Sequence, residues 1–570
     1  MASSKMQSNY FHSSPKIPDF QTSNNQSKNH NLYSDETGVY SSKHPRITLP
    51  SDPFLDVVSC VFSHKHNGKT ALTDAASGVS ISYSELQPLV KSMASGLHHQ
   101  MGVSKGDVVL ILLPNSIYFP IILLGVLYLG AVVTTLNPLS SFSETKKQTL
   151  GSHARFAFTV LEKANELNSI GISTIVVPEN HSFDSNEPQF ATFRKLISHH
   201  HDPVPRGIIK QDDTAAILYS SGTTGSSKGV VLSHRNLISA VELFVRFEAS
   251  QYEFAPEDNV YLAVIPMFHI YGLVLFTLGI LSLGTRIVVM KKFSVDEMVR
   301  AIDRYGVTHF PGVPPLVSAL IRAGKGHGGK SLKSLKQVSC GAAPVSTKII
   351  EEFLHYFPKV DFIQGYGVSE SAAVGTRGFN TRDLHNYTSA GLLAPNMQAK
   401  VVDWVTGLHL PPGKTGELWL RGSGIMKEYL NNVEATSSTV DKDGWLHTGD
   451  IVYFDQNGYL YIVDRLKEII KYKGFQIAPA DLEDVLASHP DILDAAVTGI
   501  KDEEAGEVPV AFVVMKPGVE TSESSIIDFV AKQVAPYKKV RKVIFTHMVP
   551  RSAAGKILRR QLKDQLPSRL

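Results

Sequence analysis

The chain has 570 residues, which is too many for one hydrophobic core. Its composition is that of an ordinary globular enzyme. Its 56 basic and 53 acidic residues give a net charge of +3, which gives no reason to expect a nucleic-acid partner or an electrostatic membrane anchor. The only cysteines, Cys60 and Cys340, have no disulfide or zinc-ligand spacing, which favours a reducing compartment.

The first part of the chain changes character near residue 45. Residues 1–45 are rich in Ser, Asn, Lys and His without an apolar period, which predicts a disordered tail and leaves a weak organellar-targeting role open. From about Leu49, short apolar strands such as residues 108–112 and 287–290 alternate with helical stretches. This pattern predicts a large α/β domain of several lobes over residues 46–463.

The longest apolar run, Ile121 to Leu136, is shorter than the roughly 20 residues that a membrane-spanning helix needs. We expect a buried helix here and no stable membrane insertion. A second helix is expected further along, where Leu237, Val241 and Phe244 share one apolar face and Glu242 and Arg246 form a pair on the other side.

Residues 219–229 read Tyr-Ser-Ser-Gly-Thr-Thr-Gly-Ser-Ser-Lys-Gly and predict a loop that holds a polyphosphate. Its glycines let the backbone approach an anion, its hydroxyls donate hydrogen bonds, and Lys228 adds a positive charge. A Walker A loop is disfavoured because Lys228 is followed by Gly229 and a strand-like run. A flexible linker is disfavoured because apolar segments flank the loop on both sides.

Beyond Asp464 the pattern becomes that of a small α+β domain, over residues 468–570, of ordinary size. Its predicted elements are a helix at residues 480–488, strands at 495–500 and 508–515, a helix at 525–534 and a strand near 540–546.

Five further segments carry chemistry and follow the loop in a fixed order. They are Pro266-Met-Phe-His-Ile-Tyr-Gly272, Gln364-Gly-Tyr-Gly-Val-Ser-Glu-Ser371, Gly416-Glu-Leu-Trp-Leu-Arg-Gly422, the segment from Trp445 to Asp450 with Asp464 to Gly474, and Pro550 to Arg560. Together with the loop, they resemble the acyl-adenylate-forming superfamily, and within it the plant 4-coumarate:CoA ligase-like acyl-CoA ligases, over roughly residues 45–566.

The resemblance implies an enzyme that activates a small-molecule carboxylic acid with ATP and Mg²⁺ and transfers it to coenzyme A. Both steps concentrate negative charge and therefore need cations and donors around the phosphates. The implied catalytic residues are His269, Lys471, Gln476 and Lys556. The implied cofactor-binding residues are Ser220, Ser221, Gly222, Thr223, Thr224, Lys228, Gln364, Gly365, Ser369, Asp450, Arg465, Lys467, Lys292, Lys473 and Gly474. Ile270, Tyr271, Gly341 and Ala342 are implied for the substrate site and Glu370 for the metal.

Within these sets, the resemblance implies individual roles. Lys556 bridges the attacking carboxylate and the α-phosphate, and Asp450 holds the ribose with help from Arg465. Gly341, Ala342, Ala343 and Tyr366 resemble the adenine wall. Residues 464–467 resemble the hinge about which the small domain rotates between the two half-reactions. The segment with Lys471, Lys473, Gly474 and Gln476 resembles the one that then moves into the site, with Lys473 and Gly474 near CoA. Taken singly, a lysine in a basic run or a loop glutamate is usually a solvated surface residue.

The predicted acyl pocket departs from the authentic 4-coumarate:CoA ligases. Val274, Gly312, Ser339, Ala373 and Gly375 fall where those enzymes tend to have Asn, Met, Lys, Pro and Leu. Trp419 and Glu428 also depart from the family pattern. The smaller or less polar pocket favours a longer, more aliphatic acid over a hydroxycinnamate.

The chain ends in Ser568-Arg569-Leu570, which is similar to the Ser-Lys-Leu peroxisomal address. We therefore expect a peroxisomal ligase for a fatty acid or a cyclopentenone precursor of jasmonate, with the cytoplasm as the alternative location. A hydroxycinnamate:CoA ligase, a catalytically silent adenylate-binding protein and a luciferase-type oxygenating enzyme remain as alternatives.

Overall fold

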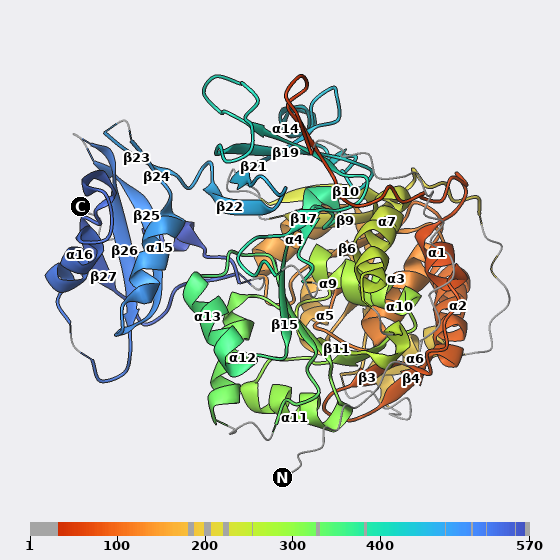
Figure 1. Cartoon of the computed structure of the whole chain (residues 1–570). Helices are drawn as coiled ribbons and strands as arrows, with labels where there is room; N and C mark the ends of the chain where they lie inside the picture. The colour runs from red at the N-terminus through yellow and green to blue at the C-terminus, as the bar shows by residue number, and fades with distance from the viewer. Residues whose placement is uncertain are drawn as a thin grey trace, which may run out of the picture.

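The computed structural model describes residues 32–179, 187–198, 204, 207–220, 227–252, 255–326, 331–380, 385–473, 475–502, 505–519, 521–552 and 555–564, with Phe475 and Gln476 described by their backbone alone. It is a mixed α/β structure with a large N-terminal domain and a small C-terminal domain, as predicted (Figure 1).

The first sheet of the large domain is mainly parallel. Its strand order is β20-β10-β9-β6-β5-β7-β8, and only β10 runs antiparallel to its neighbours. The bounds are β20 Glu428–Tyr429, β10 Lys228–Ser233, β9 Thr214–Ser220, β6 Val132–Thr135, β5 Val108–Leu112, β7 Ala154–Thr159 and β8 Ser173–Val176.

The second sheet has the order β17-β16-β15-β14-β13-β11-β12-β3-β4 and is parallel from β15 to β3. The bounds are β17 Leu392–Leu393, β16 Thr376–Arg377, β15 Asp361–Tyr366, β14 Gln337–Cys340, β13 His309–Gly312, β11 Val260–Ala263, β12 Arg286–Val289, β3 Thr70–Asp74 and β4 Ser80–Ser82.

The main core lies between these two sheets. Val109 and Ile111 of β5 share it with Ile287 and Val289 of β12, because alternate residues of a strand point to the same face. The helices that contribute buried side chains to this core are α1 Val57–Ser63, α2 Tyr83–Met101, α3 Tyr118–Tyr128, α7 His234–Ala240, the π-helix η2 Val241–Arg246, α8 Phe247–Ser250, α9 Ile270–Gly272, the π-helix η4 Leu273–Gly279 and α10 Ile280–Ser282 (Figure 1).

The outer faces of both sheets are covered by further helices. Val288 of β12 and Phe310 of β13 pack in a second core with α11 Val295–Tyr305, α12 Pro314–Gly326 and α13 Thr347–Tyr356. Leu110 of β5 packs with Leu167 of α5 Leu161–Asn168. The remaining helices of the large domain are α4 Phe142–Gly151, η1 Pro188–Phe190, α6 Ala191–Ile197, η3 Pro256–Asp258, η5 Ser369–Ser371 and α14 Val433–Thr439.

One predicted helix of this domain needs correction, and another is confirmed. The run from Ile121 to Leu136 is not one buried helix: helix α3 ends near Tyr128, Gly130 turns the chain with a φ of +72°, and strand β6 follows. Helix α7 and η2 bury Leu237, Val241 and Phe244, and Glu242 pairs with Arg246 (Nε to Oε2, 3.5 Å), as predicted. Glu242 is buried and Arg246 is half-buried.

The large domain also has an antiparallel sheet, and it includes residues that were predicted to lie in the N-terminal tail. Its order is β1-β2-β18-β19-β21-β22, with bounds β1 Tyr33–Ser34, β2 Val39–Ser41, β18 Gln398–Val402, β19 Gly416–Arg421, β21 Leu446–Phe454 and β22 Leu460–Arg465 (Figure 1). Tyr40 is buried and stacks on Phe454 with ring centroids 4.5 Å apart. Residues 33–41 therefore belong to the folded domain, and the predicted tail of residues 1–45 extends too far towards the C-terminus.

The C-terminal domain agrees closely with its predicted elements. Its sheet has the order β24-β23-β26-β25, with β27 parallel to β26, and the bounds are β23 Ile470–Tyr472, β24 Phe475–Ile477, β25 Ile492–Asp502, β26 Gly506–Met515 and β27 Lys542–Phe545. Its helices are α15 Pro479–Ser488, α16 Glu523–Ala531, η6 Pro536–Lys538 and α17 Arg559–Asp564. The core of this domain is separate from the cores of the large domain.

Candidate active site

Small residues gather where the parallel strands β13, β14 and β15 end. The register pairs Gly312 with Cys340 and Cys340 with Gln364, so that Gly312, Gly341 and Gly365 lie side by side at or just beyond the strand ends. The ring of Tyr271 covers Gly341: a Cβ there would lie 3.6 Å from the ring. Ala342 follows with a φ of +66°, a strained conformation of the kind found at functional sites. Ligands of open α/β sheets bind at such strand ends.

The buried Asp450 and Tyr366 form a polar group with the half-buried Arg465 beside this edge. Asp450 and Arg465 are paired in the register of β21 and β22, and the Arg465 Nε lies 2.9 Å from the Asp450 Oδ1. The Tyr366 hydroxyl donates a 2.6 Å hydrogen bond to the Asp450 Oδ2. Burial and the adjacent Asp450 carboxylate raise the pKa of Tyr366 well above its ordinary value. The phenol therefore remains a donor, and the Asp450 carboxylate is held in one orientation.

A second group joins the strands that flank the phosphate-loop sequence. Ser220 ends β9, Lys228 begins β10, and the two are register partners. The Ser220 Oγ donates a 3.0 Å hydrogen bond to the Glu370 Oε1, and the Tyr429 hydroxyl donates one of 2.8 Å to the same oxygen. The Lys228 Nζ lies 4.9 Å from the centroid of the Tyr429 ring. The structure thus brings together three residues that the sequence predicted and one, Tyr429, that it did not.

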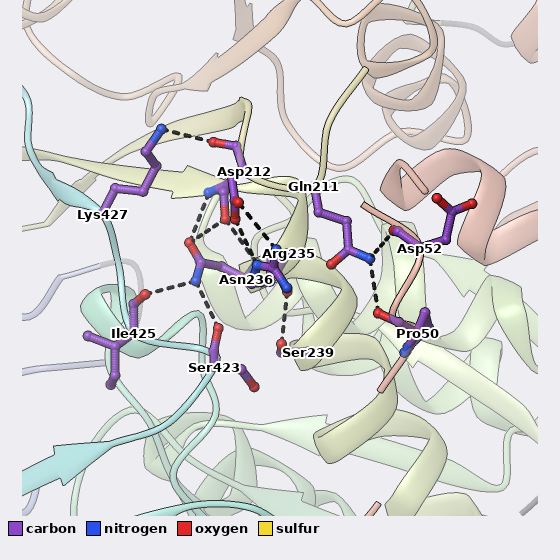
Figure 2. Close-up of polar contacts among 11 residues, drawn as sticks. Pro50, Asp52, Gln211, Asp212, Arg235, Asn236, Ser239, Ser423, Ile425 and Lys427 are labelled. Carbon is purple, nitrogen blue, oxygen red and sulfur yellow. Dashed lines mark hydrogen bonds and ion pairs between the residues drawn. The ribbon is translucent and has the colours of Figure 1, made fainter. Parts of the chain in front are cut away.

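The segment that carries Tyr429 is held by a polar network (Figure 2). Asn236, in the first turn of α7, donates its amide to the carbonyls of Ser423 (2.9 Å) and Ile425 (2.8 Å). The Lys427 Nζ donates to the Asp212 carbonyl at 2.9 Å. The Asp212 carboxylate in turn accepts from Arg235, the residue before Asn236. These contacts fix the segment beside β10.

The same network reaches the N-terminal part of the chain. Gln211 donates its amide to the carbonyls of Pro50 (3.0 Å) and Asp52 (2.6 Å). Backbone contacts complete the segment, since Met426 N donates to Glu370 O and Leu430 N to Gly229 O. Tyr429 is therefore positioned on Glu370 by contacts from several parts of the sequence.

Lys556 approaches the Asp450 group from the C-terminal domain. Its backbone is held in a tight turn, where its N–H donates to the Ser552 Oγ and its carbonyl accepts from Ser552 N. A Cβ on the preceding Gly555 would lie 3.2 Å from Val313 of the large domain, so this turn packs against it. Burial, with further contributions from Arg465 and Lys467, lowers the pKa of Lys556 to about 8.

The predicted hinge, residues 464–467, is tied to the small domain by Asp464. Its carboxylate accepts from Arg465 N (2.7 Å) and from Ala480 N (2.9 Å) in the first turn of α15. Burial raises the pKa of Asp464 above its ordinary value. The Lys467 Nζ lies 3.8 Å from the Glu468 Oε1. Burial lowers the pKa of Lys467 below its ordinary value. Asp464 thus links the segment that carries Arg465 to the start of α15.

His269, Ile270 and Tyr271 stand together at the start of α9. Ile270 is buried, and His269 and Tyr271 are half-buried. Burial lowers the pKa of His269 to about 4, so its imidazole is neutral at pH 7. A neutral imidazole has one ring nitrogen that donates a hydrogen bond and one that accepts.

Other predicted site residues lie further from these groups or make different contacts. Gln364 donates its amide to the Tyr387 carbonyl at 2.7 Å, and the half-buried Ser369 begins η5. Lys292, Lys471 and Lys473 have exposed side chains. No contact that the structure describes for Lys471 or Lys473 joins either residue to Asp450, Glu370 or Lys556.

Several predicted positions fall outside the described residues. They are Ser221, Gly222, Thr223 and Thr224 of the loop, Gly474, the side chain of Gln476, and the terminal Ser568-Arg569-Leu570. Sequence reasoning also missed Asn236, Tyr429 and the Arg377–Glu248 pair. None of these carries a local motif, because each acquires its partner from a distant part of the chain.

The fold and these contacts define an α/β enzyme whose polar site lies between a large domain and a small one. Residues 61–430 match the model of the AMP-binding enzyme family, and residues 481–556 match that of the AMP-binding enzyme C-terminal domain. The chain belongs to the AMP-binding enzyme family.

Similar proteins include plant CoA ligases. The chain is 58% identical over 531 residues to "4-coumarate--CoA ligase-like 6" of Arabidopsis thaliana, covering 93% of this chain and 94% of the relative. It is 43% identical over 538 residues to "Peroxisomal OPC-8:0-CoA ligase 1" of the same plant, covering 93% and 96%.

Solved structures share the same architecture. ATP-bound MatB from Rhodopseudomonas palustris has a TM-score of 0.78 at 25% identity, covering 89% of this chain and 98% of MatB. MenE from Bacillus subtilis, in complex with ATP and magnesium ion, has a TM-score of 0.76 at 27% identity, covering 89% and 99%. None of the helices within the described ranges is long and apolar enough to cross a membrane.

Proposed function

We propose that this enzyme is an ATP-dependent carboxylic acid:CoA ligase that works through an acyl-adenylate and acts on a fatty or oxylipin acid. It is an AMP-forming acyl-CoA synthetase by family and uses ATP, Mg²⁺ and coenzyme A. The observation that carries the proposed mechanism is the packing of the Gly555–Lys556 turn of the small domain against Val313 of the large domain. This packing brings Lys556 within electrostatic reach of the Asp450–Arg465 pair.

In the first step the acid's carboxylate attacks the α-phosphorus of ATP and pyrophosphate leaves. The carboxylate is already ionised near pH 7, so this step needs charge stabilisation rather than a general base. Asp450 accepts from the ribose hydroxyls, in an orientation held by Tyr366 and Arg465. Lys556 then lies close to the reacting atoms and stabilises the charge that develops on the α-phosphate.

Glu370 suits a role in holding Mg²⁺. Its Oε1 accepts two hydrogen bonds, from Ser220 and Tyr429, whereas its Oε2 receives no hydrogen bond from any residue that the structure describes. A carboxylate with one oxygen fixed and the other available is an appropriate oxygen ligand for a hard cation. When bound, the ion neutralises charge on the phosphate oxygens. Lys228 is proposed to hold the phosphates from the same side.

The second step, displacement of AMP by the CoA thiol, is proposed to follow rotation of the small domain about residues 464–467. Two observations support this. Lys556 faces the Asp450 group while Lys471 and Lys473 are exposed, which is the arrangement that adenylation requires. After rotation, Lys473 and its neighbours are proposed to contact CoA, with Lys292 on the large domain. His269 is proposed to lie near the acyl carboxylate and then the thiol path.

A fatty or oxylipin acid and a peroxisomal location are supported by three features. The predicted pocket positions Gly312, Ser339 and Gly375 have small side chains or none. The terminal Ser-Arg-Leu resembles a peroxisomal address, and a relative at 43% identity is named a peroxisomal OPC-8:0-CoA ligase.

A panel of acids tests the proposal. Purified enzyme with ATP, Mg²⁺ and CoA is incubated with fatty, oxylipin and hydroxycinnamic acids, and both pyrophosphate and CoA thioester are measured. Faster conversion of the first two classes supports the proposal, and faster conversion of 4-coumarate makes the enzyme a hydroxycinnamate ligase. Absence of thioester from every acid, with ATP still bound, points to a silent adenylate-binding protein. Light or oxygen uptake with a luciferin-type acid points to an oxygenating enzyme.

A further inference from the structure

A buried ion pair lies beside the proposed acyl site. Arg377 of β16 and Glu248 of α8 are both buried, and the Arg377 Nε and Nη2 lie 2.5 and 3.0 Å from the two Glu248 carboxylate oxygens. Burial alone lowers the pKa of Arg377, but Glu248 and Tyr271 reverse this effect and keep it above its ordinary value. The guanidinium is therefore charged in an interior where a hydrocarbon side chain is the usual occupant.

This pair contacts the residues that form the proposed substrate site. The Arg377 guanidinium interacts with the Tyr271 hydroxyl, and that hydroxyl lies 3.4 Å from the Ser339 Oγ. The guanidinium also lies over the Phe244 ring, 5.1 Å from its centroid. A Cβ on Gly365 would lie 3.0 Å from the Arg377 Nη1, so glycine at this position leaves room for the arginine.

The strand register places these polar groups at the inner end of the acyl site. Gly341 lies at the end of β14, and Ser339, two residues earlier, points to the same face one step further in. The Arg377 backbone lies level with Gly341, because Arg377 is the register partner of Gly365 on β15, and its guanidinium reaches the Tyr271 hydroxyl next to Ser339. One step inward from Gly341, the site therefore presents the Ser339 and Tyr271 hydroxyls, with the guanidinium beside them.

The polar character continues behind Glu248. A cavity of about 20 Å³, close to the volume one water needs, has a mixed lining. Its polar residues are Glu248, Tyr252, Asn259, Thr285 and His309, and its other residues are Ala249, Pro256, Tyr261 and Leu283. The Tyr252 hydroxyl accepts from Gln337 at 2.7 Å and lies 3.2 Å from the Asp361 carboxylate. An acyl chain that extended past Arg377 would therefore meet polar groups rather than a hydrocarbon channel.

We propose that Arg377, positioned by Glu248, acts with Tyr271 and Ser339 as a polar end wall that selects acids with a hydrogen-bond acceptor, a carbonyl or hydroxyl oxygen, at the end remote from the carboxylate. An arginine has five N–H donors, and Glu248 uses two of them, so donors remain for Tyr271 and for a substrate oxygen. This inference rests on the proposed ligase function and names the kind of acid within it.

An unsubstituted fatty acid would place its terminal methyl group against the hydrogen-bond donors of the end wall. A methyl group cannot accept a hydrogen bond, so these donors would remain without a partner. A site built to hydrogen-bond a substrate group discriminates strongly against the analogue that lacks the group, because buried polar atoms lose their partners. The small pocket residues allow a long acid, and the end wall makes a polar end favourable.

The test compares matched acids of equal length, such as decanoic acid and 9-oxodecanoic acid, with similar pairs about two carbons shorter and longer. The measured quantity is kcat/KM for CoA-thioester formation. For the best length, wild-type enzyme should prefer the oxo acid by about tenfold or more. Tyr271→Phe removes one hydroxyl without leaving a buried charge and should reduce that preference several-fold, mainly through the oxo acid.

The double variant Arg377→Met with Glu248→Leu removes both charges together and should shift the preference towards decanoic acid. Its thermal unfolding is measured alongside, and Tyr271→Phe decides the question if the double variant does not fold. Arg155→Met, at an arginine whose side chain is 64% exposed, is the matched control and should leave the preference unchanged.

Equal kcat/KM for both members of every pair, or a preference unaffected by Tyr271→Phe, would overturn the end wall while leaving the ligase function intact. Failure of every acid to form a CoA thioester would overturn the ligase function itself, and the end wall with it.

Discussion

The Tyr429 phenol joins the two charged residues of the proposed phosphate site, because its hydroxyl donates to Glu370 at 2.8 Å while its ring lies 4.9 Å from the Lys228 ammonium. Tyr429→Phe keeps the ring and removes only the hydroxyl. We expect the Mg²⁺ concentration for half-maximal pyrophosphate release to rise about three- to tenfold, because the Glu370 carboxylate loses one of its two fixed donors. A Mg²⁺ titration measures this. Tyr453→Phe, whose ring stacks on Tyr461, is the control, and equal titrations for both variants would contradict the role of Tyr429.

The titration of Lys556 should make adenylate formation slower at alkaline pH. Its pKa of about 8 means that the ammonium is charged at pH 7 and loses its proton as the pH rises through 8. Because the charged form stabilises the developing phosphate charge, kcat/KM for adenylate formation should fall above about pH 8. Lys556→Arg should move this fall to higher pH, since arginine stays protonated. Identical pH profiles for the two proteins would count against this assignment.

Lys556→Ala separates the two half-reactions. Adenylate formation, measured as pyrophosphate release, should be lost almost completely. Thioester formation from supplied acyl-adenylate should remain largely intact. A comparable loss of both rates would assign Lys556 to something other than the first step.

Lys473 should matter mainly for the CoA step. Its side chain is exposed in this arrangement, so Lys473→Ala should leave pyrophosphate release within about twofold while raising the KM for CoA several-fold. The exposed Lys442 offers the matched change, Lys442→Ala, which should affect neither step. An unchanged KM for CoA in Lys473→Ala would contradict the proposed contact.

Asp464 should contribute to both stability and domain rotation. Asp464→Ala removes the acceptor for Ala480 N at the start of α15 and should cost about 1–2 kcal/mol in the unfolding of the small domain. Because the same carboxylate holds Arg465 N, the ratio of the two half-reaction rates should change as well. Denaturant unfolding and stopped-flow rates measure these effects. The exposed Asp528, changed to alanine, should alter neither.

The β1-β2 hairpin should be needed for the stability of the antiparallel sheet. Tyr40→Ala removes a buried ring stacked on Phe454 and should lower the free energy of unfolding by about 3–5 kcal/mol. Tyr40→Phe loses only the hydrogen bond to the Leu410 carbonyl and should cost about 1 kcal/mol. Both values come from denaturant titration, and equal stability of all three proteins would place the hairpin outside the cooperative unit.

Much of the fold was accessible from local pattern. The elements of the C-terminal domain match their predicted positions, because each is a short periodic segment bounded by turn residues. The predictions failed where tertiary context overrides local pattern. The run from Ile121 to Leu136 is apolar throughout because both α3 and β6 are buried on all sides, so its composition could not show where the helix ends. The hairpin of residues 33–41 is short and mostly polar, and it becomes part of the fold through its pairing with β18 and the burial of Tyr40 against Phe454.

The sequence by itself determined the family, the order of the motifs and the residue types of the site, because these depend on local composition and spacing. Only the tertiary structure decided which of these residues meet: Ser220 and Tyr429 on Glu370, Tyr366 on Asp450, and Arg377 beside Tyr271. Such contacts join residues that are far apart along the chain. Local composition and spacing in a single sequence do not show which distant residues the folded strands bring together. The polar end of the proposed acyl site belongs to this second class, since small pocket residues alone had indicated a more aliphatic acid.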